Sequence, residues 1–430
     1  MTKSPLTTTS TGTAIRSGIP WFDDRGEPVN AHGACVVEAE GRYYLFGEYK
    51  SDDVNGFAGF SCYSSENLVD WTFERMALPL QPDGLLGPGR VGERPKVMRC
   101  PATGRYVMYM HADSRRYVDP CIGVAISDNV AGPYTLLGPL AFDGAPLRRW
   151  DMGSFQDEDG TGYILLHEGD IYRLSADYLT ADALVAERIA EGGESPAMFV
   201  DDGTYFVMFS HKTSWERNDN YYLTAPAVSG PWTMRGLIAP EGTRTHNSQC
   251  TFVLSLQRPA GVVHMYMGDR WSFPRQASAA TYVWQPLRIA DDTAQLTEFL
   301  PAWSPDEGSS TDISGTPVEA AFTAGAPGPA LDLSFEGRAV AVMGSTDAGS
   351  GYARITVSDA RGETVHAGYI DFYSAIQGNG LRYLTPELPA ARYRLRIEAT
   401  GEMPICFNKA GTRFGADGSQ VSVSGLVVVP

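Results

Sequence analysis

The sequence is short of positive charge. Its 430 residues include 34 lysines and arginines against 51 aspartates and glutamates, which gives a formal net charge of −17 at pH 7. Because the phosphates of a nucleic acid would be repelled by such a surface, this balance argues against a nucleic-acid partner. The charge does not identify a substrate, since an acidic surface commonly serves solubility.

Long apolar runs and closely spaced cysteines are also missing. No stretch is long and apolar enough to cross a bilayer, so no membrane partner is expected. The Thr/Ser-rich N-terminus lacks the apolar core of a secretory signal, which predicts a cytoplasmic protein, or a secreted one whose signal is absent from this sequence. The six cysteines are scattered without a CxxC spacing, which predicts buried thiols rather than a metal site.

The histidines form no recognisable metal motif. There are seven of them, and no HxH or HExxH spacing occurs. The sequence therefore predicts that no metal or other cofactor is required. A structural calcium ion is the one alternative, with His32 or His246 holding a water bound to it.

One short pattern recurs five times within the first 300 residues. Each copy has a turn glycine followed by alternating aromatic and apolar residues, and a short apolar strand precedes it, as in a β-hairpin. Radially repeated antiparallel sheets of this spacing are typical of a β-propeller, so the predicted fold is all-β with five blades. A pair of sandwiches or a β-helix is the alternative architecture. The five glycines are Gly41, Gly104, Gly160, Gly203 and Gly261.

The composition changes after Trp303. Residues 304–317 are a polar run rich in Gly, Ser and Asp, and short alternating strands typical of a β-sandwich follow. The sequence therefore predicts a five-bladed β-propeller over residues 1–303, a linker over 304–317 and a C-terminal β-sandwich domain over 318–430. Nothing in the C-terminal region marks a site.

A polar side chain stands at a nearly constant distance before each recurring glycine. The innermost strands of a propeller surround a central channel, so these five positions are expected to meet in one pocket. Neighbouring carboxyl groups drive each other's pKa values apart, and one of them can then act as a general acid. Paired carboxylates that flank a sugar bond are the usual apparatus of glycoside hydrolysis. The alternative is that each residue only satisfies backbone amides of a turn. The five residues are His32, Glu93, Asp151, Glu194 and Gln249.

Several segments resemble glycoside hydrolase family 43, and most closely its exo-β-1,3-galactanase branch. The matching strings include AHGACVV, GERPKV, WDMGSFQDEDG, GESPAMFVDDGTYFVMFS and NSQCTFV, and they keep their order. The resemblance implies an inverting, exo-acting enzyme that releases galactose from β-1,3-galactan or from arabinogalactan-derived oligosaccharides. The alternatives are an α-L-arabinofuranosidase, β-xylosidase or galactofuranosidase on the same scaffold, and a propeller that binds sugar without catalysis.

The resemblance also implies roles for individual residues. Glu194 matches the general acid of the family, and Asp151 matches the carboxylate that orients this acid and tunes its pKa. Most of the family has an aspartate base in the first blade, where this sequence has His32 and no carboxylate. Gln249 matches the glutamine that positions or activates water in the galactanase branch, and Glu93 matches a further acidic residue that contacts the sugar.

The group that activates the water stays open between two residues. A neutral amide is a poor base, so Glu93 acting through water is an alternative to Gln249. An inverting mechanism needs about 6.5–9.5 Å between the acid and the group that holds the water. The Glu194 carboxyl and the Gln249 amide are therefore expected to face each other across such a gap.

Further side chains are candidates for binding the oligosaccharide or polysaccharide substrate. His32, Glu48 and Tyr117 are expected to contact sugar hydroxyls. Tryptophans can stack on the apolar face of a pyranose, although blade cores also contain them. The candidate platforms are Trp215, Trp271 and Trp284.

Overall fold

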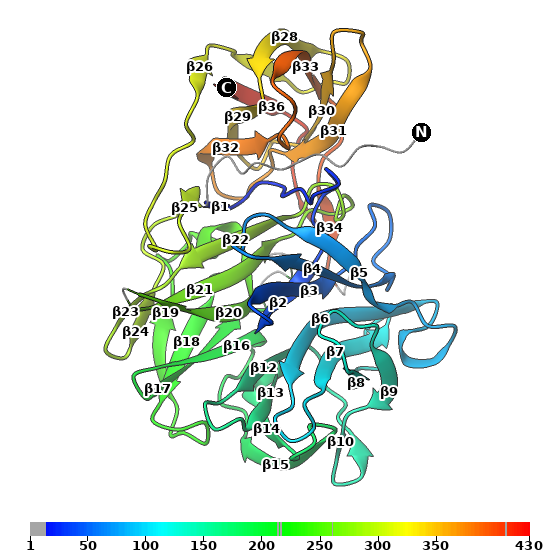
Figure 1. The fold of residues 1–430 in the computed structure, drawn as a ribbon, viewed down its shortest axis with the longest axis vertical. Coiled ribbons are helices and arrows are strands. Elements are labelled where there is room, and N and C mark those ends of the chain that lie inside the picture. The colour runs from blue at the N-terminus through cyan, green and yellow to red at the C-terminus, as the bar shows by residue number, and fades with distance from the viewer. Residues whose placement is uncertain (1–13, 213–214, 216, 260, 409–410) are drawn as a thin grey trace. The chain divides into compact units, whose positions relative to one another are not determined.

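The computed structural model describes residues 14–212, 215, 217–259, 261–408 and 411–430 (Figure 1). Within these residues, helix is confined to three short turns, α1 (Arg244–Asn247), η1 (Gly84–Leu86) and η2 (His167–Gly169). All other regular elements are strands, so the all-β prediction is confirmed. None of the described helices is long and apolar enough to cross a membrane.

The chain divides into two compact units that do not follow the chain order. The first, which we call the repeat unit, comprises residues 30–269 and 283–299. The second, which we call the sandwich unit, comprises the described part of residues 1–29 together with residues 270–282 and 300–430. The linker expected at residues 304–317 remains a prediction.

The repeat unit holds five sheets of three or more strands. The first is β2 (His32–Ala39), β3 (Arg42–Glu48), β4 (Gly59–Ser65) and β5 (Thr72–Pro79), and the second is β6 (Arg90–Arg99), β7 (Tyr106–Ser114), β8 (Cys121–Ser127) and β9 (Thr135–Pro139). The third is β12 (Met152–Gln156), β13 (Gly162–Leu166), β14 (Ile171–Leu174) and β15 (Thr180–Ala186), extended by β10 (Ala141–Phe142) and β11 (Ala145–Pro146). The fourth is β16 (Glu194–Asp201), β17 (Thr204–Ser210), β18 (Tyr221–Ala225) and β19 (Thr233–Leu237). The fifth is β20 (Gln249–Arg258), β21 (Gly261–Arg270) and β22 (Thr281–Pro286), followed by the hairpin β23 (Arg288–Ala290) and β24 (Thr293–Gln295).

The five predicted hairpins are all present. Four of the recurring glycines lie between the first two strands of their sheets, and Gly261 is the first residue of β21. All five have a positive φ, for example 73° at Gly41 and 74° at Gly203. Residues other than glycine rarely adopt this left-handed conformation, which explains the recurrence of glycine. The aromatic and apolar run after each glycine then forms the second strand.

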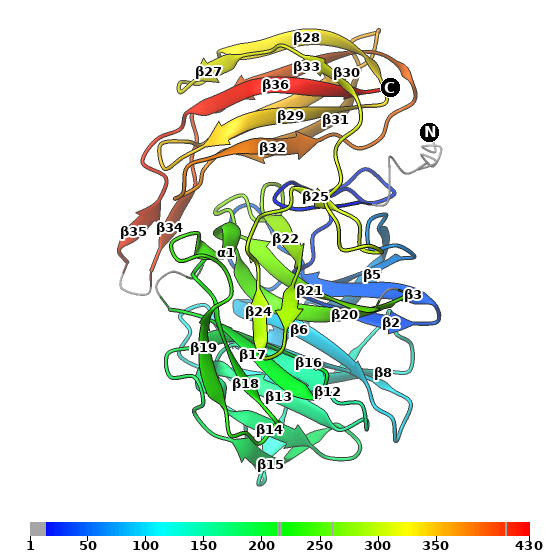
Figure 2. The ribbon, with the colours of Figure 1, turned by 90° about the vertical axis from the view of Figure 1, so that its left-hand side faces the viewer.

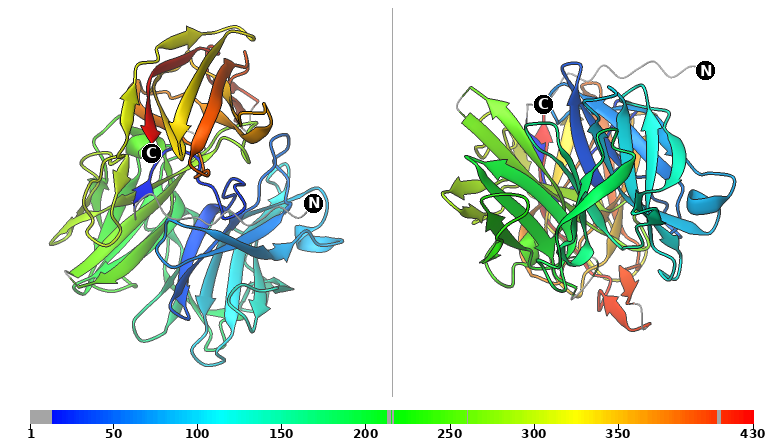
Figure 3. Two further views of the ribbon diagram at one scale, coloured as in Figure 1. Left: turned by 45° about the horizontal axis from the view of Figure 1, so that its top comes forward. Right: turned by 90° about the horizontal axis from the view of Figure 1, so that it is seen from below.

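The first strands of the five sheets lie next to one another. β2 contacts β6, β6 contacts β12, β12 contacts β16, β16 contacts β20, and β20 contacts β2. Apolar side chains fill the space between consecutive sheets, as Phe46 and Met108 do between the first two and Phe206 and Tyr266 between the last two. This packing brings together the starts of strands that are far apart in sequence (Figure 3).

The sandwich unit has two sheets packed on a common core (Figure 2). One sheet contains β28 (Ala330–Gly337), β33 (Ala391–Ala399), β30 (Tyr352–Ser358) and β31 (Thr364–Asp371). The other contains β26 (Thr316–Val318), β27 (Phe322–Ala324), β36 (Val421–Val429), β29 (Ala339–Thr346) and β32 (Gly378–Leu384). Two short pairs complete the unit, β1 (Ile15–Arg16) with β25 (Ala302–Trp303) and β34 (Ile405–Phe407) with β35 (Arg413–Gly415).

Aromatic contacts tie residues 14–29 and 270–282 into the sandwich unit. Phe22 packs edge-on against His366, with 5.0 Å between the ring centroids. Trp21 stacks on Tyr282 at 4.6 Å. These contacts join residues far apart in sequence, so no local pattern predicts them.

Candidate active site

The five predicted residues lie at or near the starts of the five first strands. His32, Glu194 and Gln249 open β2, β16 and β20, Asp151 directly precedes β12, and Glu93 lies within β6. Bulges interrupt strand pairing directly after His32, Glu93 and Glu194, and one residue after Gln249. A bulge bends a strand and redirects its side chains, so the same local irregularity recurs beside four of the five polar side chains.

Left-handed backbone accompanies these bulges. The residues that follow His32, Glu93 and Glu194 all have positive φ, 61° at Gly33, 51° at Arg94 and 57° at Ser195, and Asp151 itself has a φ of 44°. A side chain other than glycine in this region costs about 1–2 kcal/mol. Such strain persists only where surrounding contacts enforce it, and it gathers at functional sites.

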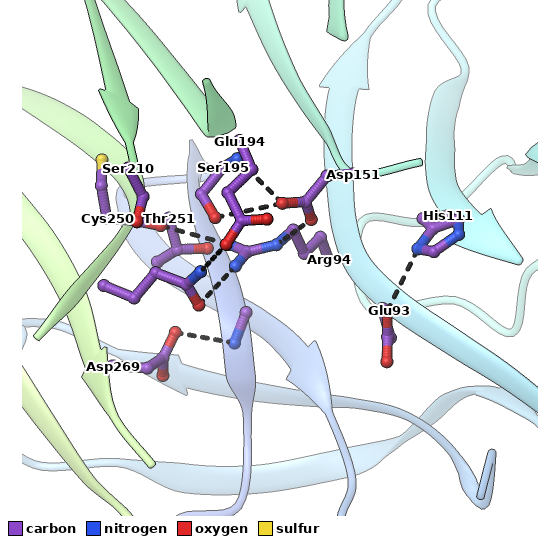
Figure 4. A network of polar contacts seen from close by, with 12 residues as sticks. Glu93, Arg94, His111, Asp151, Glu194, Ser195, Ser210, Cys250, Thr251 and Asp269 are labelled. Carbon is purple, nitrogen blue, oxygen red and sulfur yellow. Dashed lines mark hydrogen bonds and ion pairs between the residues drawn. The ribbon is translucent and has the colours of Figure 1, made fainter. Parts of the chain in front are cut away.

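Arg94 is the centre of the polar network (Figure 4). Its side chain is buried, and its Nε forms an ion pair with Oδ1 of Asp151. Nη2 donates to Oε1 of Gln249 at 2.8 Å, and Nη1 donates to the carbonyl of Cys250 at 3.2 Å. Its backbone N–H donates to Oε1 of Glu48 at 2.9 Å. The guanidinium therefore joins β6 to Asp151, directly before β12, and to the start of β20, and the backbone N–H of the same residue adds a contact to β3.

Asp151 is linked to the strand that carries Glu194. Its Oδ2 accepts hydrogen bonds from the backbone N–H of Ser195 at 2.8 Å and from the Ser195 hydroxyl at 3.1 Å. Because Ser195 directly follows Glu194, Asp151 fixes the backbone on which Glu194 stands.

The prediction that a gap separates Glu194 from Gln249 is wrong. Gln249 Nε2 donates directly to Oε1 of Glu194 at 3.1 Å. The two residues open the neighbouring strands β16 and β20, and Arg94 occupies the amide oxygen of Gln249, so the amide nitrogen turns toward Glu194. Water can enter between the two groups only after this contact opens.

Glu93 lies in a second cluster beside this network (Figure 4). Its Oε1 accepts from the Tyr117 hydroxyl at 2.6 Å, and its Oε2 lies 3.1 Å from Nδ1 of His111. The other ring nitrogen of His111 lies 3.5 Å from a carboxylate oxygen of Asp113. His111 therefore lies between two carboxylates, and Tyr117, a predicted sugar ligand, is next to Glu93.

These contacts shift the pKa values of Glu93 and His111. Burial alone raises the pKa of Glu93, but His111, Lys50 and Tyr117 outweigh it and lower the pKa from 4.5 to about 2. Burial lowers the pKa of His111, but the carboxylates of Asp113 and Glu93 raise it from 6.5 to about 9. At neutral pH the cluster therefore holds an ionised Glu93 and a protonated His111.

Glu48 lies between the two clusters. It is buried, forms an ion pair with Lys50, and accepts from the backbone of Arg94. Burial raises the pKa of the Glu48 carboxyl, and the charge of Lys50 opposes that effect. Lys50 also donates to Asn55, whose amide donates to the Tyr117 hydroxyl at 2.9 Å.

The predicted sugar ligand His32 has a protein partner. Its Nδ1 lies 3.1 Å from Oδ1 of Asp269, whose Oδ2 accepts from the Gly33 backbone at 2.9 Å. His246 lies 3.2 Å from the carbonyl of Leu296. Across the described chain, no group of three or more His, Cys, Asp or Glu side chains is arranged to hold a metal ion. The calcium alternative and the expectation that no cofactor is required remain predictions.

The tryptophan predictions differ in outcome. Trp284 is fully buried and packs edge-on against Trp71 at 6.1 Å, so the prediction that it forms a sugar platform is wrong. Consecutive residues of β22 are buried on both of its faces, so a tryptophan on either face would lie in the core. Trp271 is 8% exposed and belongs to the sandwich unit, and Trp215 is half-buried in the loop between β17 and β18. Roles for these two remain predictions.

Sequence reasoning missed several residues of the site. Arg94 lies inside the string GERPKV, and His111 lies in the run that follows the recurring Gly104. The signal that would have found His111 is strand register, since Glu93 and His111 are directly paired across β6 and β7. Nothing local indicates that Arg94 reaches Gln249. The prediction of buried thiols is confirmed for all six cysteines.

Replacing His111 by Gln is expected to move the acidic limb of the activity profile to higher pH. Glu93 would lose its cationic partner but remain buried, so its pKa would rise from about 2 toward or above 4.5. Measuring kcat/KM between about pH 4 and 8 tests this. The matched control is His264→Gln, which breaks a pair outside the site between the buried His264 and the partly exposed Asp201. An acidic limb that does not move in the His111 variant would contradict the assignment.

Comparison with known proteins places this site in a family. The model for glycosyl hydrolases family 43 matches residues 28–249. A protein from Bifidobacterium bifidum, described as a candidate exo-β-1,3-galactanase, is 38% identical over 66% of this chain and 96% of its own, with a TM-score of 0.62. The exo-β-1,3-galactanase of Phanerochaete chrysosporium, solved with β-1,3-galactotriose, is 27% identical over 96% of this chain and 99% of its own, with a TM-score of 0.71.

A more distant likeness concerns the fold alone. The exo-β-1,3-galactanase of Clostridium thermocellum is 22% identical, with 97% of each chain covered and a TM-score of 0.64. A search of curated proteins finds no match. The family model covers more than half of the chain, including Glu48, Glu93, Asp151, Glu194 and Gln249. The chain belongs to glycoside hydrolase family 43 and is a glycoside hydrolase.

Proposed function

We propose that this enzyme is an inverting, exo-acting hydrolase that releases galactose from β-1,3-galactan or from arabinogalactan-derived oligosaccharides. The observation that carries the proposal is the Asp151–Arg94–Gln249–Glu194 network, in which a carboxylic acid stands beside an amide instead of a second carboxylate. Relatives at 38% and 27% identity, described as exo-β-1,3-galactanases, support the choice of substrate.

The proposed scaffold is a five-bladed β-propeller followed by an accessory β-sandwich domain. Five sheets in chain order, with first strands in mutual contact from β2 round to β20, support it. In such a fold the network around Arg94 lies on the central axis. The sugar would then enter at the end of the channel formed by the starts of the first strands.

Glu194 is the proposed general acid. It protonates the leaving oxygen, while Asp151 holds the following residue, Ser195, by two hydrogen bonds and so fixes the direction of the acid. The amide of Gln249 donates to Oε1 of Glu194, which places the acid beside the proposed holder of the water.

Gln249 is the proposed holder of the water. Glu93 is less suited to accept a proton, because a carboxylate whose pKa is about 2 is a weak base and already accepts from Tyr117. Arg94 polarises the amide oxygen of Gln249. When the substrate separates Gln249 from Glu194, that oxygen can orient water toward the anomeric carbon. The proton that this water loses on adding to the carbon passes to solvent. Glu93, Glu48 and Tyr117 then serve as partners for sugar hydroxyls.

The stereochemical outcome tests the proposal. A β-1,3-linked galacto-oligosaccharide should release monomeric galactose whose first-formed anomer is α, because inversion places water on the face opposite the leaving group. Proton NMR during early turnover measures the anomer, and a panel of aryl glycosides of galactose, arabinofuranose, xylose and galactofuranose checks the sugar. A first-formed β anomer would overturn inversion, and preference for another sugar would overturn the substrate.

A further inference from the structure

Lys96 carries a buried charge that the proposed mechanism does not use. It lies in β6, two residues after Arg94, and is 0% exposed. Its ammonium donates to the carbonyls of Gly33 at 2.7 Å and Ala34 at 3.2 Å. Weaker contacts go to the Thr251 hydroxyl at 3.4 Å and to the carbonyl of Pro95 at 3.5 Å. Within the described residues no carboxylate lies within ion-pair distance of it.

Burying the charge of Lys96 in these surroundings costs folding free energy. Burying an ammonium without a counter-charge sacrifices hydration that neutral oxygens only partly replace. Burial accordingly lowers the pKa of Lys96 from 10.5 to about 8. A methionine of similar length would fill the same space without this cost, so stability alone does not account for the charge.

The partners of Lys96 belong to the strands that build the site. Gly33 and Ala34 form the bulge at the start of β2, and Thr251 is two residues after Gln249 on β20. The Thr251 hydroxyl also donates to the carbonyl of Ala34 at 3.2 Å. Arg94 holds Gln249 and Cys250 from the same strand, β6. Two cations of β6 therefore contact this segment of β20, Arg94 at Gln249 and Lys96 at Thr251.

We propose that Lys96 is a positioning residue for hydrolysis, whose ammonium locks the bulged starts of β2 and β20 to β6 and thereby holds Gln249 where it orients the water. The proposal rests on the function proposed above for Gln249. A neutral amine has only two N–H donors and no charge, so loss of the proton weakens this lock. The charged and titratable groups that face Lys96 are Arg94, Asp269, Glu48, Cys35 and Cys250, from five different strands.

The pH dependence follows from these groups. Burial, the largest effect, and the charge of Arg94 lower the pKa of Lys96, whereas Cys35, Asp269 and Glu48 raise it. Because its pKa is lower in the folded chain than in the unfolded chain, Lys96 destabilises the fold below about pH 8, and that penalty fades as the pH rises through 8 toward 10.5. Activity should change in the opposite direction and fall as Lys96 loses its proton.

Lys96→Met tests the proposal with the full-length enzyme. We expect kcat to fall at least about tenfold with little change in KM, because the lock acts on the water and not on sugar binding. We also expect the alkaline limb near pH 8 to disappear. Thermal stability at neutral pH should stay the same or rise. Arg105→Met, which removes an exposed charge paired with Asp128, is the control and should leave the profile unchanged.

Thr251→Val is the milder second variant if Lys96→Met does not fold. It keeps the shape of the side chain and removes one acceptor of the ammonium, so kcat should fall a few-fold and the alkaline limb should move to lower pH. Wild-type kcat and an unchanged profile in the folded variants would overturn the proposal, as would a loss of kcat that only follows a loss of folded enzyme. Failure of the proposed function is distinct, since it would appear in the wild type as a retained anomer or as another preferred sugar.

Discussion

Replacing Glu194 by Gln should lower kcat on β-1,3-galacto-oligosaccharides by about 10²–10⁴-fold, which is the usual contribution of a general acid. The glutamine side chain keeps the size of the original and can still meet Gln249, but it has no acidic proton to donate to the leaving oxygen. An aryl galactoside with a strongly acidic phenol as leaving group needs little protonation, so its kcat should fall far less. Steady-state kinetics on both substrates measures the difference.

The control for this variant lies three residues earlier, in the loop before β16. Glu191 has a side chain that is 86% exposed and only a long ion pair with Arg188, so Glu191→Gln should leave both rates unchanged. Equal losses on the oligosaccharide and the activated aryl galactoside in Glu194→Gln would argue against a proton donor at this position. They would point instead to a role in binding or in water placement.

Replacing Arg94 should damage both the fold and the chemistry. Arg94→Met leaves Asp151 without its ion-pair partner and the Gln249 amide without its donor. Removing one partner of a buried charge pair typically costs about 3–5 kcal/mol of folding free energy. Urea unfolding should show that loss, and kcat should fall at least about 100-fold because the amide is no longer oriented.

Arg94→Lys separates these two effects. Lysine keeps the charge but lacks the planar fork, so it cannot reach Asp151, Gln249 and the Cys250 carbonyl together. This variant should recover much of the stability and little of the activity. Arg90→Lys on the same strand is the control, since its partner Asp119 is half-exposed and such a pair contributes at most about 1 kcal/mol. Wild-type kcat in Arg94→Lys would show that the network around Arg94 is not needed for hydrolysis.

Local sequence patterns predicted a large part of the fold. A turn glycine such as Gly41 and the alternating run after it depend only on φ preferences and on the two-residue period of a strand, so both are readable in sequence. The constant spacing before these glycines likewise pointed to the starts of the first strands, where His32, Asp151, Glu194 and Gln249 are found. The division into units was not readable, because Phe22 and Tyr282 join the sandwich unit through contacts distant in sequence.

The sequence by itself determined the all-β class, the five hairpins and which polar residues open the first strands, because each depends on interactions between neighbours in the chain. Only the tertiary structure decided how those residues are paired. Arg94 reaches Gln249 across 155 residues, and the left-handed turns at Arg94 and Ser195 aim side chains in directions that strand alternation does not give. The contact between Glu194 and Gln249 and the burial of Trp284 have the same origin, since both depend on which strands pack together. Packing of this kind is set by the whole core, and no short segment encodes it.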